Sequence, residues 1–306
     1  MARASTEYKR EHKPDFGRER IDILYEDEHL MIIFKPSGML TCPYPGSHAR
    51  TAQDVIEQLL RKKGSFSRNH KPLVVHRLDR DTSGVMMFAM TEAAQKKIMD
   101  NWHTMVTERL YHAVAENPVG HAAPLPDSGL IDDNLAFNSH NFGFVPKGEN
   151  KEKFETITAR THYKILKRGK THTLFELSLD TGRKNQIRAH LASKGYTLAG
   201  DENYLAKTDP FGRLALHART IEFNHPFTGE HMIFEQPEPE DWAVVVEKGD
   251  RSGIVPVWVR NRPDIKGHSG NHHKSEDEMP SKAQMRPTRK SQAGMDFIQR
   301  GKNYRK

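Results

Sequence analysis

Hydrophobic residues recur with the short period of β-strands along several stretches of the chain. Alternation, or a short apolar run bounded by turn residues, is typical of strands. Such runs pair into two predicted hairpins, one in residues 21–40 that turns at 26–29 and one in residues 155–182 that turns at 168–170. Further strands are predicted within residues 74–90, 108–116, 214–226 and 231–237.

Three other stretches place apolar residues at helical spacing. Residues 51–64 form a predicted helix with Thr51 as N-cap, and residues 91–105 form a second one with Thr91 as N-cap. A short helix is predicted over residues 185–195, where a glycine ends it.

The order of these elements indicates the fold class. Strands joined to their neighbours by short turns, with helices between them, favour an α+β fold with a mixed, mostly antiparallel sheet. Residues 117–153 are rich in Pro, Gly and Asn and show no periodicity, so they are predicted to be an insertion without regular elements.

Charge divides the chain into three parts. The 306 residues carry a net +7, but residues 251–306 alone hold 13 Lys and Arg against 5 Asp and Glu, which leaves 34 against 35 for residues 1–250. We therefore expect a flexible polar arm in residues 1–20, a catalytic domain in residues 21–250, and a basic, mostly disordered arm in residues 251–306. Such an arm indicates a polyanionic partner, most simply nucleic acid, the alternative being a solubilising tail.

Composition also bears on the compartment. The single cysteine, Cys42, excludes an internal disulfide and an all-cysteine metal site, in agreement with a reducing compartment. No apolar run of roughly 18 residues occurs, and the N-terminus lacks the pattern of a signal or transit peptide. The sequence therefore predicts a cytoplasmic protein that does not contact a membrane.

The stretch VVHRLDRDTSGVMMFAM, residues 74–90, places a charged loop between two apolar runs. Asp79 lies between Arg77 and Arg80, and Thr82-Ser83-Gly84 can turn the chain sharply. A partly desolvated carboxylate that a cation keeps ionised is suited to nucleophilic attack or charge stabilisation. The alternative is a solvated charge cluster that caps a turn.

Two further features contain candidate functional residues. In LDTGRKNQIRAH, Arg183 and Arg188 flank a helix start, and together with backbone donors they can bind a phosphate or a carboxylate. The alternative is a pair of ordinary exposed arginines. Tyr111, in ERLYHAVAE, is either a core residue or a ring that stacks on a base.

Several other catalytic motifs are excluded. HRLD is similar to a kinase catalytic loop. In kinases the metal-binding Asp-Phe-Gly triplet follows that loop, whereas Asp15-Phe16-Gly17 precedes it in this chain, and no GxGxxG occurs. P-loop, HExxH and GxSxG sequences are absent, and the two-carboxylate pattern of glycoside hydrolases lacks a second partner. Three histidines in the basic arm favour adventitious metal binding over a folded site, namely His268, His272 and His273.

Four motifs in a fixed order resemble the RluA-type pseudouridine synthases, over residues 21–242. They are HRLDRDTSGVMMFA, ERLYHAVAE, LDTGRKNQIRAHLASKGYTLAGDENY and LALHARTIEFNHPFTGE. The resemblance implies the pseudouridine synthase fold, with flanking helices and a central catalytic cleft. It further implies isomerisation of selected uridines in structured rRNA or tRNA, without cofactor or metal, and we expect a monomer with RNA as its partner.

The resemblance also implies roles for individual residues. Asp79 matches the nucleophile that attacks the sugar or the base, Tyr111 the ring that stacks on uracil and assists proton removal, and Arg188 the basic partner of the aspartate. Arg77 matches the arginine that fills the gap left by a flipped nucleotide. The remaining predicted RNA contacts are Arg183, His76 and Arg80.

The chain departs from the family in two places. Lys184-Asn185 stands where the family usually has Thr or Ser followed by His, so a contact from that His is expected to be missing. No S4-type RNA-binding domain is recognisable in residues 1–20, and the basic arm is expected to substitute for it through phosphate contacts.

Two rival functions stay open. One is a catalytically silent RNA-binding or assembly factor with the same fold, and the other is a different glycosidic chemistry on nucleosides. The trio of Asp79, Tyr111 and Arg188 argues against the first, because a binding protein has no need of a desolvated carboxylate facing anionic RNA. The basic arm argues against the second.

Overall fold

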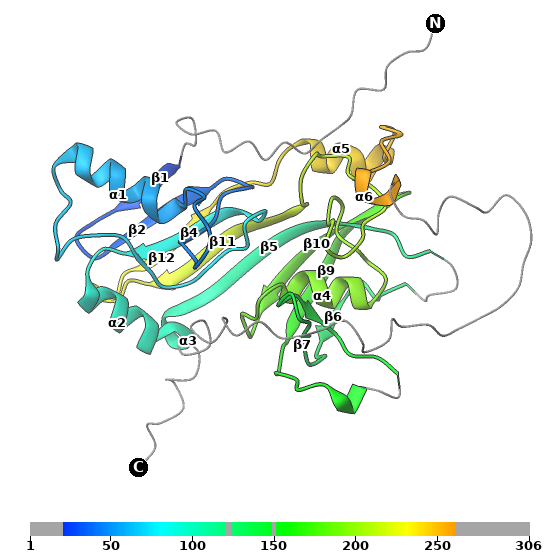
Figure 1. Ribbon diagram of the computed structural model, residues 1–306, viewed down its shortest axis with the longest axis horizontal. Coiled ribbons are helices and arrows are strands. Elements are labelled where there is room, and N and C mark those ends of the chain that lie inside the picture. Colours follow the sequence, from blue (N-terminus) through cyan, green and yellow to red (C-terminus); the bar gives the residue numbers. More distant parts are fainter. Residues whose placement is uncertain (1–20, 120–123, 149–150, 261–306) are drawn as a thin grey trace, which may run out of the picture. The chain divides into compact units, whose positions relative to one another are not determined.

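The computed structural model describes residues 21–119, 124–148 and 151–260 (Figure 1). The predicted N-terminal arm and residues 261–306 of the predicted basic arm lie outside the described residues. Within the described part, no helix is both long enough and apolar enough to cross a bilayer.

The described residues contain both predicted kinds of element. The strands are β1 Asp22–Glu26, β2 Leu30–Lys35, β3 Leu73–Val74, β4 Ser83–Ala89, β5 Val106–Glu116, β6 Ser128–Ile131, β7 Ala136–Phe137, β8 Gly143–Phe144, β9 Thr161–Arg168, β10 His172–Leu179, β11 Leu216–Asn224 and β12 His231–Glu235. The helices are α1 Ala52–Lys63, α2 Glu92–Asp100, α3 Trp102–Met105, α4 Gln186–Ser193, α5 Asp241–Lys248 and α6 Val257–Arg260, with one 3₁₀ turn at Lys151–Lys153.

A mixed sheet organises these elements, as the sequence predicts. Its order is β1-β2-β4-β11-β5-β10-β9-β6, with β12 also paired to β11 and β3 to β4. All of these pairs are antiparallel except β4 with β11, which run parallel where Ser83 and Gly84 face His217 and Ala218. Figure 1 shows α1 and α2 near the β1–β2 side of the sheet and α4 on the side of β9 and β10.

The parallel contact between β4 and β11 depends on a glycine. Gly84 has φ +125°, and a Cβ there would lie 2.1 Å from the carbonyl oxygen of Ala218. Any side chain would therefore push the two strands apart. The predicted turn at residues 82–84 lies earlier in the structure, because Thr82 N donates to Asp79 O at 3.1 Å and Gly84 already belongs to β4.

Helix α1 begins and ends where local chemistry predicts. Thr51 and Asp54 form a reciprocal capping box, and Gly64 takes the left-handed conformation at φ 73°. The second predicted helix is wrong in extent, because α2 ends at Asp100 and α3 is a separate turn. The Asn101 side chain donates to Lys97 O at 2.8 Å, a local hydrogen bond that closes the end of α2.

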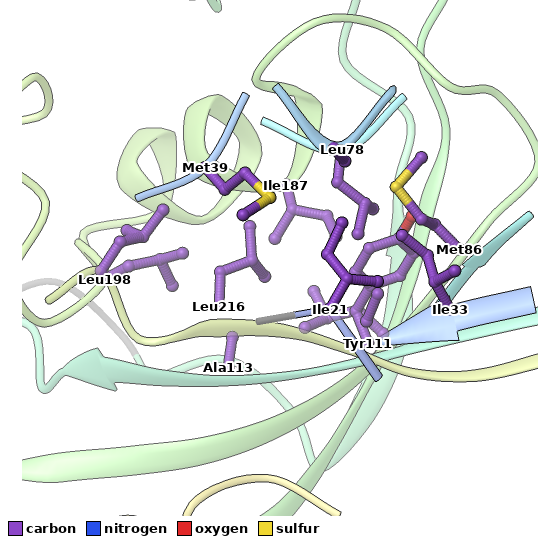
Figure 2. Close-up of a cluster of buried hydrophobic side chains, with 14 of the residues drawn as sticks. Ile21, Ile33, Met39, Leu78, Met86, Tyr111, Ala113, Ile187, Leu198 and Leu216 are labelled. Atoms are coloured by element: carbon purple, nitrogen blue, oxygen red, sulfur yellow. The ribbon is translucent and has the colours of Figure 1, made fainter. Parts of the chain in front are cut away.

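The sheet buries side chains on both faces. Met31 and Ile33 of β2 join a central cluster with Leu78 and Tyr111, whereas Leu30 and Ile32 join a second cluster with residues of α2, α3 and β11. Figure 2 shows Leu78, Met86 and Tyr111 together in the central cluster. Because β2 and β4 are buried on both sides, their sequences are nearly continuous apolar runs.

Three segments differ from the sequence predictions. The insertion at 117–153 contains β6, which extends the sheet at β9, and the hairpin β7–β8; these strands are too short to leave a period in the sequence. The apolar run before the charged loop forms only the two-residue, half-buried β3. The first residues of the predicted basic arm are folded, because Trp258 of α6 donates from Nε1 to Ala206 O at 2.8 Å.

Candidate active site

The charged loop between β3 and β4 is anchored through Leu78. The Leu78 side chain is buried, and both of its backbone polar groups bond the hydroxyl of Thr41, at 3.2 Å from N and 2.9 Å from O. Asp79 follows directly, with 27% of its side chain exposed. The neighbouring residue therefore fixes the backbone of Asp79 while its carboxylate stays accessible.

A buried lysine also fixes the charged loop. Lys35, at the end of β2, has no exposed surface and donates from Nζ to Pro36 O at 2.9 Å, Met39 O at 2.7 Å and Arg80 O at 3.1 Å. These three carbonyls match the three hydrogens of an ammonium group. Burial lowers the pKa of Lys35 to about 7, although the charges of Asp81 and Asp79 oppose that shift.

Arg188 joins Asp79 to a second carboxylate. From α4, its Nε and Nη2 each donate to Asp201 at 2.7 Å, and its Nη1 lies 3.4 Å from Asp79 Oδ2. Burial opposes the charge of Arg188, but hydrogen bonds and attraction from Asp201, together with Asp79, raise its pKa further above the ordinary value. The guanidinium also lies 5.1 Å from the ring centre of Tyr204.

Asn185 makes the shorter contact with Asp79. Its Nδ2 donates to Asp79 Oδ2 at 2.8 Å, so this oxygen faces both Asn185 and Arg188. At this departure from the family pattern, an asparagine therefore contacts Asp79. Among the described residues, no hydrogen bond reaches Asp79 Oδ1, which leaves one carboxylate oxygen held and the other unengaged.

Tyr111 lies on β5 within the central cluster, only 7% exposed (Figure 2). Burial raises the pKa of its hydroxyl; Arg109 lowers it, and the nearby charge of Asp79 raises it again. The phenol therefore keeps its proton at neutral pH, and its ring, beside the buried Leu78, adjoins the loop of Asp79.

The predicted RNA contacts separate into exposed and structural residues. Three of them are exposed, namely Arg77, Arg80 and Arg183. Arg80 donates from Nε to Gly38 O at 3.2 Å, and Arg183 donates from Nε to Thr158 O at 3.0 Å. His76 accepts from Met87 N at 2.9 Å, and burial, with Arg109 nearby, lowers its pKa to about 3. This bond to β4 fixes the loop, and contact of His76 with RNA stays a prediction.

Arg183 and Arg188, predicted to form a joint anion site, are engaged differently in the structure. Arg183 lies on the surface against Thr158, whereas Arg188 is buried against Asp201. Sequence reasoning also missed Asn185, Asp201, Tyr204 and Lys35. The motif LAGDENY contains Asp201 and Tyr204, so the signal was present, but nothing local distinguishes this Asp from the others in the chain.

The profile that describes RNA pseudouridylate synthases matches residues 29–193, which include Asp79, Tyr111 and Arg188. The chain belongs to this family. It is 34% identical over 241 residues to the RNA pseudouridine synthase YlyB of Bacillus subtilis, covering 76% of this chain and 74% of that one. It is 32% identical over 255 residues to the ribosomal large subunit pseudouridine synthase D of Pseudomonas aeruginosa, covering 77% and 74%.

Solved structures show the same fold. Human RNA pseudouridylate synthase domain containing 1 superposes with a TM-score of 0.56 at 20% identity, over 72% of this chain and 84% of that one. Human RNA pseudouridylate synthase domain containing 4 gives 0.55 at 21% identity, over 72% and 90%. The α+β sheet that places Asp79 beside Arg188 is thus the pseudouridine synthase fold.

Proposed function

We propose that this pseudouridine synthase isomerises uridines of ribosomal RNA, with Asp79 as its nucleophile. The main support is the asymmetric carboxylate, in which Asn185 and Arg188 hold Oδ2 while Oδ1 has no donor among the described residues. An oriented oxygen that needs no release from a partner is suited to attack. The relative named for the large ribosomal subunit supports rRNA as the substrate class.

The proposed reaction conserves every atom of the uridine. The bond from C1′ to N1 breaks, the uracil turns while it stays in the site, and C1′ bonds to C5. C5 then loses its proton and N1 ends with one. Asp79 carries either the sugar or the base between these steps, and no water or second carboxylate is required.

We assign Tyr111 to stacking on the uracil. Its buried ring and raised pKa support a neutral phenol, and a protonated phenol is a poor base. Tyr111→Phe separates this role from proton transfer, because phenylalanine keeps the ring. If removal of the C5 proton requires the hydroxyl, the variant binds RNA normally and stalls after the glycosidic bond breaks.

We further propose that the target uridine leaves its stack to reach Asp79. Extrusion costs a few kcal/mol, and stacking on one aromatic ring returns roughly 1–3 kcal/mol. Arg77 is exposed two residues from Asp79 and makes no hydrogen bond or ion pair with the described residues, which supports its use as the side chain that fills the vacated place.

The basic residues 251–306 are proposed to add sequence-independent phosphate contacts. Deleting residues 261–306, which leaves Trp258 and α6 in place, should weaken RNA binding and reduce its salt dependence. Equal affinity of both proteins at low and moderate salt would reject this part of the proposal.

We also propose that the enzyme acts as a cytoplasmic monomer. The single cysteine supports a reducing compartment. Light scattering of the purified protein, with and without RNA, measures the oligomeric state directly.

The test of the function is a map of pseudouridine in rRNA and tRNA from cells with and without the protein, repeated with purified enzyme on the RNA found. Loss of one or more rRNA sites, and their restoration in vitro, is the expected result. Loss of tRNA sites alone would replace rRNA by tRNA. RNA binding without any isomerisation would favour the silent assembly factor.

A further inference from the structure

We infer that Asn185 is a two-sided positioning residue, whose amide nitrogen orients Asp79 and whose amide oxygen accepts a hydrogen bond from the target nucleotide. The inference rests on the proposed function and names a contact that would help select the substrate. It is carried by three observations on Asn185: its backbone conformation, its contact with Asp79 and its unpaired oxygen.

The backbone of Asn185 adopts a rare conformation. The residue lies immediately before α4 with φ 56° and ψ 18°, the left-handed region that side chains other than asparagine and aspartate rarely occupy. It is 6% exposed, and its carbonyl accepts from Ala189 N at 2.9 Å, so the helix start fixes it in place. Such a conformation directs the side chain toward Asp79 instead of along the helix.

The direction of the amide follows from chemistry. An ionised carboxylate only accepts hydrogen bonds, so the side that faces Asp79 Oδ2, 2.8 Å away, must be the nitrogen. The amide oxygen then lies on the other side of the group. This Oδ1 is buried and has no hydrogen-bond partner among the described residues.

An unpaired buried acceptor is unfavourable in the free protein. A donor on the target nucleotide, once that nucleotide is in the reacting position, would remove this penalty. Beside the nucleophile, a target uridine offers two such donors, the ribose 2′-hydroxyl and the N3–H of uracil. Either one would place the nucleotide against Asp79, and the second would also discriminate against cytosine, whose N3 carries no hydrogen.

The first experiment compares Asn185→Gly with Asn141→Gly. Glycine takes the left-handed backbone readily, so each variant removes a side chain without adding strain. Asn141 is the matched control, since it has φ 60° and is exposed in the turn between β7 and β8. With RNA that the wild type modifies, we expect the single-turnover rate of Asn185→Gly to fall by about 10- to 100-fold, while its affinity for RNA and the rate of Asn141→Gly stay within about threefold.

The second experiment identifies the donor. The target uridine is replaced by 2′-deoxyuridine, which lacks the hydroxyl, or by 3-methyluridine, which lacks the N3 hydrogen. One analogue should slow the wild type by about tenfold or more and have little further effect on Asn185→Gly, as expected for two changes that remove one contact. Asn185→Asp, which keeps an acceptor but repels Asp79, should be slow and yet remain sensitive to that analogue.

Two results would overturn the inference. One is an unchanged rate for Asn185→Gly on RNA that the wild type converts, and the other is an equal slowing of wild type and Asn185→Gly by both analogues. A wild type that converts no uridine in any RNA would instead overturn the proposed function, so the two failures are distinguishable.

Discussion

Two aspartates share one arginine in this molecule, and they differ in almost every other respect. Asp201 is fully buried, and both of its oxygens bond Arg188 at 2.7 Å. Asp79 is 27% exposed, and only Oδ2 approaches Arg188, at 3.4 Å. Arg188 therefore forms a buried, bidentate ion pair with Asp201 and a longer, partly exposed ion pair with Asp79.

This difference explains how a carboxylate can be both held and reactive. Asp201 fixes the guanidinium in a bidentate pair, so Arg188 can extend Nη1 toward Asp79 without being drawn away. Asp79 needs only a directional contact, and Asn185 supplies a shorter one.

Replacing Asp79 tests the open side. Asp79→Asn keeps the shape of the side chain but removes the anionic oxygen, so the rate of uridine isomerisation should fall by roughly 10³-fold or more. Its midpoint in urea should stay close to that of the wild type, because the side chain is partly exposed and its ion pair is long. Full isomerisation by this variant would remove Asp79 from the mechanism.

Replacing Asp201 tests the closed side. Asp201→Asn removes the bidentate partner of the buried Arg188 and leaves only the longer contact with Asp79, which should lower the free energy of unfolding by about 3–5 kcal/mol. The matched control is Asp132→Asn, which removes an exposed carboxylate 3.5 Å from Arg160 and should cost about 0–1 kcal/mol. Equal losses in urea denaturation would show that the pair with Arg188 is no more structural than a surface ion pair.

The stability of the protein should also depend on pH, through a buried histidine at the end of the Asp79 loop. Ser83, where β4 begins, contacts the buried His217 at 2.8 Å, and burial lowers the pKa of His217 to about 4. The folded protein therefore keeps this ring neutral, whereas the unfolded chain protonates it below about 6.5. Stability should be complete above that pH and fall by up to about 3 kcal/mol as the pH drops toward 4.

Urea unfolding at several pH values between these limits measures this effect. His217→Gln isolates the contribution, since glutamine does not titrate and the other buried histidines are unchanged. The wild type should lose more stability than the variant on acidification. Parallel curves for the two proteins would mean that His217 does not bring about the loss.

The exposed arginines should give the smallest effects, and effects of another kind. Arg77→Ala and Arg183→Ala should weaken RNA binding a few-fold and reduce the dependence of log K on log salt by about 1. Thermal unfolding should not change measurably, in contrast to Asp201→Asn. A large loss of stability in Arg77→Ala would place this residue with the structural arginine Arg188.

Much of the framework depends on local interactions and could be read from the sequence. The capping box at Thr51, both hairpins and the position of Asp79 in a loop before a buried strand were all predictable, because hydrophobic period and capping act over a few residues. The break at Asn101 was missed, since one side-chain hydrogen bond outweighs the helical pattern around it. The short strands β6 to β8 were missed because their pairing, not their composition, makes them strands.

Residue types near Asp79 could be named from the sequence alone, and its motif order pointed to Arg188 where local residues suggested Arg77 or Arg80. How they are engaged is visible only in the folded chain: Arg188, 109 residues from Asp79, is shared with Asp201, and Asn185 contacts Asp79 from a left-handed backbone. These contacts cannot be predicted from the sequence because a charge-assisted hydrogen bond depends on tenths of an ångström. Such distances are set by how β4, α4 and the turn at Asp201 pack, and no local pattern encodes them.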